Sequence, residues 1–100
     1  MLDITSEELK KRLDAGEDLI VIDVREPYEY EAFNIGVENI PLGQINLAIE
    51  QLGNYRNREI VVLCRSGMRS GQAKMFLLGN GFSNVRNLIG GMLDWQAKFA

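Results

Sequence analysis

The chain has 100 residues, of which 46% are hydrophobic and 25% charged, with a net charge of −3; these are the proportions of an ordinary globular protein and exclude a disordered chain. The length suits one domain, residues 1–100, and a single cysteine without any histidine excludes an internal disulfide, Cys-His and Ser-His-Asp catalysis and nearly all zinc sites. No apolar run approaches the roughly 20 residues that span a bilayer, and the acidic amino terminus lacks the pattern of a secretory signal, so we expect a cytoplasmic protein with no membrane contact.

The first half of the chain predicts a helix, a strand and a second short helix. Thr5-Ser6-Glu7-Glu8 is a capping box, so a helix is expected to begin there and to end at Gly16. The β-branched run 19–24 is flanked by turn residues, which indicates a strand buried on both faces, as in a parallel sheet. Pro27 suits the first turn of a helix over 26–33.

The second half continues the alternation of strands and helices. A short strand is expected over 39–42, because Pro41 prevents a longer one. The remaining elements are expected as helices over 45–52, 69–78 and 92–99 and as strands over 60–63 and 85–88. Phe76, Trp95 and Phe99 lie at helical spacing and are expected in the core. This order predicts an α/β layer fold with a mainly parallel sheet.

Two strands of this sheet end in polar residues. If the strands that end at Asp23 and Cys64 are parallel, their carboxyl ends share one edge of the sheet, where ligands of open α/β sheets gather. Asp23 and Arg25 would then lie near the loop that follows Cys64.

Charge is unevenly divided along the chain. Residues 1–50 hold twelve acids and four bases, a balance of −8, whereas residues 51–100 hold seven bases and two acids, a balance of +5. Five bases lie on both sides of the only cysteine: Arg56, Arg58, Arg65, Arg69 and Lys74. They favour a small anion there, with ordinary solvated surface charge as the alternative. Nucleic acid is not expected, because the total charge is acidic and no aromatic residues interleave with the bases.

The stretch from Cys64 to Arg69 carries the most specific chemistry. Cys64 closes a buried strand, and the residues after it turn the chain into a helix. Backbone N–H groups in such a turn, with the positive end of the helix, favour an anion and lower the pKa of a thiol below its usual value of about 8.5. The alternative is a structural cysteine packed as a small hydrophobic residue. Neither Gly67 nor Gly71 belongs to a nucleotide-binding motif, so no cofactor is predicted. No metal is predicted either, because the chain has one cysteine and no histidine.

Four motifs occur in order between about Thr5 and Trp95. They are Asp23-Val24-Arg25-Glu26-Pro27 with Glu29-Tyr30, then Asn39-Ile40-Pro41-Leu42, then Cys64-Arg65-Ser66-Gly67-Met68-Arg69-Ser70, and finally Gly81-Phe82, Val85, Leu88, Gly90-Gly91 and Trp95. Together they resemble the single-domain rhodanese-like sulfurtransferase family. The resemblance implies an α/β, rhodanese-like fold with a short, mainly parallel five-stranded sheet flanked by helices on both faces. The chain departs from the family at Phe33-Asn34-Ile35 and Gly36-Val37-Glu38, where Gly-His-Ile and Pro-Gly-Ala are usual.

The resemblance also implies an activity. The C-x4-R loop is similar to that of sulfurtransferases, whereas related phosphatases have the wider C-x5-R loop. A thiosulfate sulfurtransferase of this type takes a sulfane sulfur from a donor as a persulfide on the cysteine, here Cys64, and passes it to a thiol, a dithiol protein or cyanide. The loop residues that would bind the donor are Arg65, Ser66, Gly67, Met68 and Arg69. Arg65 would meet the anionic donor and Arg69 would close the loop, with Asp23 and Arg25 in support or merely paired with each other.

Two other functions stay open at this point. The protein could be a sulfur-relay or interaction module that docks on a partner protein and turns over small molecules poorly. Alternatively, Cys64 could be chemically inert. In each case we expect a monomer.

Overall fold

The computed structural model describes residues 2–99. The helices are α1 (Ser6–Asp14), α2 (Pro27–Ala32), α3 (Ile49–Leu52), α4 (Met68–Gly79) and α5 (Gly91–Phe99), with 3₁₀ helices η1 (Leu42–Ala48) and η2 (Gly53–Tyr55). The strands are β1 (Ile20–Asp23), β2 (Glu38–Asn39), β3 (Glu59–Leu63) and β4 (Asn84–Asn87). Each strand and helix predicted from the residue pattern therefore has a counterpart, with shifts of a few residues at the ends and with a 3₁₀ helix in most of the segment 45–52. No helix within residues 2–99 has the length and apolarity needed to cross a membrane.

The sheet has four strands in the order β2-β1-β3-β4, and every pair is parallel. The prediction of five strands was wrong. Within residues 2–99, the amino-terminal segment adds only one bridge, between Ile4 and Leu88. Thr5 caps α1 directly after Ile4 by accepting the Glu8 N–H at 3.1 Å, so the chain enters a helix after a single paired residue.

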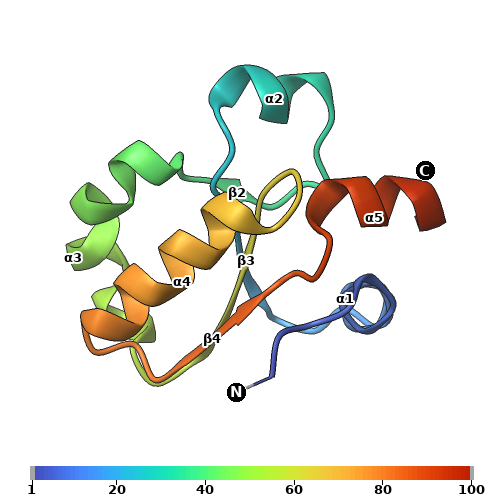
Figure 1. The fold of residues 1–100 in the computed structure, drawn as a ribbon. Coiled ribbons are helices and arrows are strands. Elements are labelled where there is room, and N and C mark those ends of the chain that lie inside the picture. Colours follow the sequence, from blue (N-terminus) through green and yellow to red (C-terminus); the bar gives the residue numbers. More distant parts are fainter. Residues whose placement is uncertain (1, 100) are drawn as a thin grey trace.

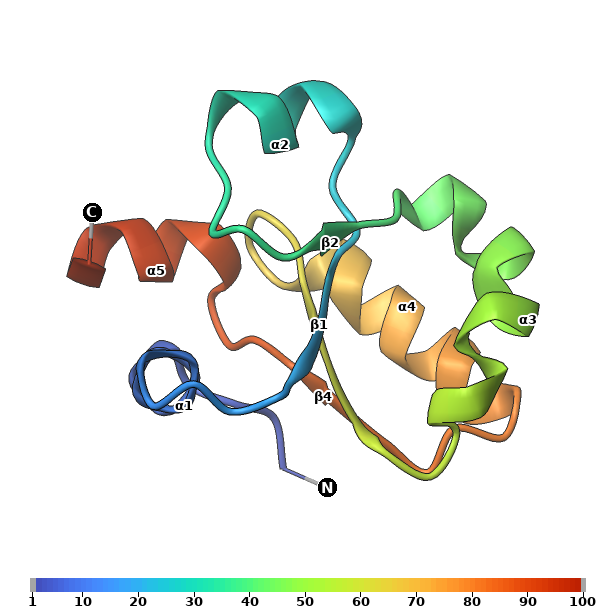
Figure 2. The same cartoon turned by 180° about the vertical axis from the view of Figure 1, so that it is seen from behind.

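Helices cover both faces of the sheet, as predicted. α3 and α4 lie on one face, α1 and α5 lie on the other, and α2 stands beyond the edge at which β1 ends (Figures 1 and 2). Asp23 pairs with Leu63 in the register of β1 and β3, so the two strands end at the same edge of the sheet. This confirms the predicted parallel arrangement and brings α2 to the loop after β3.

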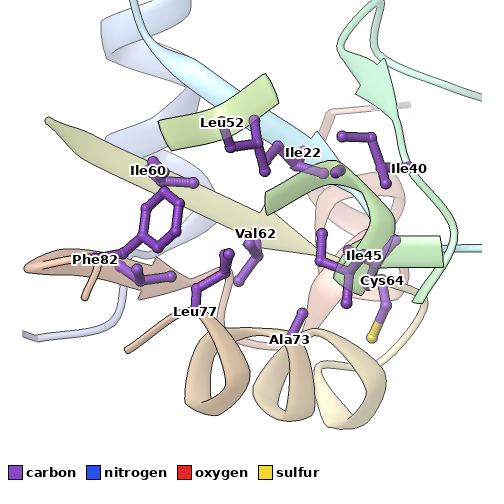
Figure 3. Close-up of a cluster of buried hydrophobic side chains, with 13 residues drawn as sticks. Ile22, Ile40, Ile45, Leu52, Ile60, Val62, Cys64, Ala73, Leu77 and Phe82 are labelled. Carbon is purple, nitrogen blue, oxygen red and sulfur yellow. The ribbon is translucent and has the colours of Figure 1, made fainter. Parts of the chain in front are cut away.

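Alternate side chains of the central strands fill two separate cores. Ile22, Ile60 and Val62 point toward α3 and α4 (Figure 3), whereas the neighbouring Val61 and Leu63 pack with α1 and α5. Cys64 continues the first alternation and lies at one end of that cluster, with its sulfur close to α4 (Figure 3). The strand pleat therefore aims the cysteine at the start of α4.

The helix predicted over 45–52 is largely a 3₁₀ helix. Ile45 and Ala48 are both buried, and their spacing of three matches the 3₁₀ turn of η1, whereas Leu52 is four residues further on in α3.

The core prediction was also only partly right, because Trp95 is buried while Phe76 and Phe99 remain 36% and 38% exposed.

The segment that departs from the family pattern forms its own turn. Asn34 donates from Nδ2 to the Tyr30 carbonyl at 3.0 Å and accepts the Gly36 N–H through Oδ1 at 2.9 Å. Gly36 has a φ of +80°, a conformation that suits glycine. Asn34 therefore shapes the connection between α2 and β2.

Candidate active site

Cys64 lies directly after β3, and residues 65–67 lead into α4. Gly67 precedes the helix with a φ of +109°, a left-handed conformation that L side chains rarely adopt. The helix begins at Met68, one residue before the predicted start. The loop is thus short, and its last residue must be glycine to turn the chain without strain.

Hydrogen-bond donors surround the sulfur of Cys64. The Gly67 N–H donates to Sγ at 3.1 Å, and the Ser70 hydroxyl lies 3.3 Å from Sγ. Burial of Cys64 acts to raise the pKa of its thiol, but the Ser70 hydroxyl and the backbone N–H groups of Ser70, Gly67 and Ser66 outweigh burial, so the pKa is lowered. The loop therefore favours a thiolate, and no histidine takes part.

The start of α5 holds the carbonyl groups of this loop. The Met92 N–H donates to the Cys64 carbonyl at 2.9 Å and the Leu93 N–H donates to the Arg65 carbonyl at 3.0 Å. The first N–H groups of a helix have no partner within it, so α5 has these donors free. In a trans peptide the carbonyl and the following N–H point in opposite directions, and residues 2–99 contain no cis peptide bond. Anchoring the Cys64 and Arg65 carbonyls to α5 therefore turns the N–H groups of Arg65 and Ser66 away from α5, and the Ser66 N–H is one of the groups that lower the pKa of Cys64.

Arg69 is bound to α2. Its Nη1 and Nη2 atoms donate to Oε1 and Oε2 of Glu29 at 2.6 and 2.9 Å, a two-pronged contact that joins the first turn of α4 to α2. The Arg69 guanidinium lowers the pKa of Glu29 to about 2, and Glu29 in turn raises the pKa of Arg69. This geometry supports the predicted role of Arg69 in closing the loop.

Asp23 and Arg25 form a buried ion pair behind α2. Nη2 of Arg25 lies 2.7 Å from Oδ2 of Asp23, and its guanidinium also donates to the Phe33 carbonyl at 2.7 Å and the Glu29 carbonyl at 3.4 Å. Within residues 2–99, neither side chain hydrogen-bonds to the loop after Cys64. The pair therefore fixes α2 and reaches the loop only through Glu29.

Most of the basic residues that flank Cys64 in the sequence are already paired. Arg58 binds Asp18, Arg69 binds Glu29 and Lys74 binds Asp3. These acids come from the first half of the chain, so the opposite charge balances of the two halves largely cancel in the fold. Arg65, by contrast, makes no side-chain hydrogen bond or ion pair within residues 2–99.

The loop covers the sulfur. Cys64 is only 1% exposed, whereas Arg65 and Ser66 are exposed and Met68 is 78% exposed. A donor must therefore reach the sulfur past the loop residues. Met68 stands in solvent at the start of α4.

Several residues that shape the site were not predicted as site residues. Ser70, Glu29 and Gly91 fall inside the quoted motifs, but nothing in the sequence showed that they contact the loop from three different elements. Asn87 was missed altogether. Its Nδ2 donates to the Gly67 carbonyl at 2.9 Å, and its Oδ1 lies 2.6 Å from the Ser70 hydroxyl. Only the pairing of β3 with β4 brings it to the loop.

Known proteins match this chain over nearly all of its length. The family model described as a rhodanese-like domain matches residues 5–98. YrkF of Bacillus subtilis is 40% identical over 97 residues, which are 96% of this chain and 51% of YrkF. The chain thus spans about half the length of that relative. A protein named sulfurtransferase from Allochromatium vinosum is 35% identical over 94 residues, 93% of this chain and 86% of that protein.

Solved structures match equally well. The human single-domain sulfurtransferase TSTD1 superposes with a TM-score of 0.84 at 25% identity, covering 98% of this chain and 97% of that one. A rhodanese-related protein from Thermoplasma volcanium gives a TM-score of 0.84 at 29% identity and covers 99% of this chain and 94% of that one.

The contact between α5 and the loop predicts a strong effect of Gly91→Ala. Gly91 has a φ of +58°, and an added Cβ would come within 2.5 Å of the Cys64 and Arg65 carbonyl oxygens. We expect the free energy of unfolding to fall by about 2 kcal/mol or more, since the strained backbone and the displaced helix both contribute. We also expect the pKa of Cys64 to rise. Urea denaturation and pH titration of the thiolate absorbance measure the two effects. Gly79→Ala, with nothing within 4 Å of the added Cβ, is the control. Equal behaviour of the two variants would contradict the role given to Gly91.

The contact between Glu29 and Arg69 predicts a pH dependence of stability. Because folding lowers the pKa of Glu29 from its ordinary 4.5 to about 2, the pair stabilises the protein fully above the higher value and loses this contribution as the pH falls toward the lower one. We expect Glu29→Gln to reduce the free energy of unfolding by about 1 kcal/mol at neutral pH, because both side chains are partly exposed. The difference from the natural protein should shrink as the pH falls from the higher pKa and vanish below the lower one. Glu31→Gln, on the same helix, is the control, and a pH-independent difference in urea titrations would refute the assignment.

Proposed function

Because the chain belongs to the rhodanese-like domain family, we propose that it is a sulfurtransferase that carries a sulfane sulfur as a persulfide on Cys64. Thiosulfate is the proposed donor class, and a thiol, a dithiol protein or cyanide is the proposed acceptor. Cys64 is the proposed catalytic residue, with Asp23 and Arg25 as positioning residues through α2. The proposed donor-binding loop consists of Arg65, Ser66, Gly67, Met68 and Arg69.

The proposed reaction has two displacement steps. In the first, the Cys64 thiolate attacks the outer sulfur of thiosulfate, the S–S bond of the donor breaks, and its electron pair leaves with sulfite. In the second, an acceptor thiolate or cyanide attacks the outer sulfur of the persulfide, and the bond to Sγ breaks with its electrons returning to Cys64. No external oxidant or reductant is needed.

One observation carries this proposal: the sulfur of Cys64 lies among the Ser70 hydroxyl and backbone N–H groups, which together lower the pKa of its thiol despite burial. A thiolate is the form that attacks, and the same amides suit the negative outer sulfur of a persulfide, as an oxyanion hole suits oxygen. Arg65 is exposed and has no acidic partner among residues 2–99, which supports attraction of an anionic donor.

A sulfur relay is the second candidate function. YrkF, to which this chain is 40% identical, carries the words sulfur carrier protein in its name. In this role the persulfide would be stable and would be discharged by a docked partner protein, with little turnover of small molecules.

Mass spectrometry after incubation with thiosulfate tests the persulfide. We expect the protein to gain one sulfur atom, and Cys64→Ser to gain none. Because Cys64 is the only cysteine, the site of the added mass is unambiguous. An alkylating reagent added to the unfolded protein verifies that the thiol is free. If the unfolded thiol reacts but the folded protein gains no sulfur, burial prevails and the proposal fails.

Discharge of the loaded protein separates the two candidate functions. Rapid release of thiocyanate on addition of cyanide would favour a free enzyme. A persulfide that survives cyanide but transfers its sulfur quickly to a dithiol protein such as a reduced thioredoxin would favour the relay.

Arg65 provides a further test of the donor class. We expect Arg65→Gln to raise the KM for thiosulfate roughly two- to tenfold and to weaken its dependence on salt, since a cation beside the loop attracts the anion. Arg58→Gln removes the same charge at the opposite end of β3 and is the control. An unchanged KM and salt dependence in steady-state kinetics of Arg65→Gln would exclude this role.

A further inference from the structure

The hydroxyl of Ser70 has two acceptors but only one proton. It lies 3.3 Å from Sγ of Cys64 and 2.6 Å from Oδ1 of Asn87. A serine hydroxyl donates one hydrogen bond, and the carbonyl oxygen of an asparagine side chain can only accept. Ser70 is fully buried and Asn87 is half-buried, so the Ser70 hydroxyl itself has no contact with water. At any moment the Ser70 proton therefore serves either the sulfur or Asn87.

The orientation of the Asn87 side chain is set from its other side. Nδ2 of Asn87 donates to the Gly67 carbonyl at 2.9 Å. A flipped amide would place two carbonyl oxygens against each other at that partly buried contact and would remove the donor of the Gly67 carbonyl. The Asn87 backbone is also held, because its N–H donates to Oδ1 of Asp3 at 2.9 Å. Oδ1 must therefore face Ser70.

The two ionisation states of Cys64 use this arrangement differently. When the sulfur is a thiol, its S–H can donate to the Ser70 oxygen while the Ser70 O–H donates to Asn87, and every group is satisfied. When the sulfur is a thiolate, it competes for the Ser70 proton, and a charged acceptor forms the stronger hydrogen bond. If the proton turns to the sulfur, Oδ1 of Asn87 loses its donor. Asn87 thus opposes the stabilisation of the thiolate by Ser70.

We propose that Asn87 is a positioning residue that competes with the Cys64 sulfur for the single proton of Ser70. This inference rests on the proposed function, because the loaded form that it concerns is the proposed persulfide on Cys64. In the free protein the Ser70 proton turns toward the negative sulfur. In the persulfide the charge lies on the outer sulfur, so the proton returns to Asn87. Asn87 therefore favours the loaded form of the protein over the free thiolate.

A double-mutant cycle on the pKa of the Cys64 thiol tests the proposal. The pKa is measured by thiolate absorbance in the natural protein, Asn87→Leu, Ser70→Ala and the double variant, with Cys64→Ser as the blank. Asn87→Leu also removes the hydrogen bond to the Gly67 carbonyl, and this loosening of the loop acts in both backgrounds. The pKa shift that Asn87→Leu causes in the Ser70→Ala background is subtracted from the shift that it causes in the natural protein. The difference is the part of the effect that depends on the Ser70 proton.

We expect this difference to be a lowering of the pKa of the Cys64 thiol by about half to one pKa unit, the effect of one hydrogen bond to a charged group that is shared with a second acceptor. A difference of zero, or a difference in the raising direction, would overturn the proposal. If Asn87→Leu proves unfolded by circular dichroism, Asn87→Ala in the same cycle gives the same comparison. Asn84→Leu, at the opposite end of the same strand beside Glu59, is the control and should leave the titration unchanged.

The cycle also separates this proposal from the proposed function. The titration uses neither a sulfur donor nor an acceptor, so a protein that fails to gain sulfur can still show the coupling. A protein that gains sulfur but shows no coupling retains the persulfide on Cys64 and refutes only the role of Asn87.

Discussion

The attachment of two loop carbonyl groups to the first turn of α5 is the interaction on which the site depends. The Ser66 N–H can point at the sulfur only if the Arg65 carbonyl of the same peptide points away and is satisfied elsewhere, because a buried carbonyl without a hydrogen bond costs about 1 to 3 kcal/mol. The Leu93 N–H supplies that donor, and the Met92 N–H holds the neighbouring Cys64 carbonyl. The free donors at the start of α5 thus fix the first two peptides of the loop. Gly91 is required because no Cβ fits where the two segments touch.

A second set of contacts fixes the opposite side of the loop. The buried pair of Asp23 and Arg25 holds the carbonyl end of α2, where a cation also suits the helix dipole. α2 then presents Glu29 to Arg69. The carboxyl ends of β1 and β3 therefore act together, one through the helix that follows it and the other through the loop. Neither Asp23 nor Arg25 needs to touch the sulfur in order to influence it.

The sequence predicted the fold well because its signals were local. Capping at Thr5, the β-branched run of β1 and the position of Pro27 each act within a few residues, and their elements lie where expected. The fifth strand, which came from the resemblance, failed because the cap at Thr5 ends pairing after Ile4. The sequence did not predict the 3₁₀ character of η1, because apolar residues spaced three and four apart occur in both helix types.

The site was predicted in part, for a different reason. Cys64 and the loop could be identified because the cysteine, the glycine and the arginines lie next to one another in the chain. The residues that orient the loop come from α2, β4 and α5, and each connection depends on sheet register or helix packing. Charge counting also misled in detail, because most of the bases that flank Cys64 in the sequence are paired with acids from the first half of the chain. Charge alone did not distinguish Arg65 from the others, and only the resemblance assigned it to the donor.

The donors around the sulfur differ in whether they can respond to its charge. Backbone amides are fixed by the loop and by the start of α4, so they stabilise a thiolate whenever it is present. Stabilising a thiolate too strongly is a disadvantage, because the nucleophilicity of a thiolate falls as the pKa of its thiol falls. The Ser70 hydroxyl is the one donor of this site that can rotate, and Asn87 gives its proton a second acceptor. In the proposed cycle the sulfur alternates between a charged and a neutral state, and the shared proton is the group that can follow this change without moving the backbone.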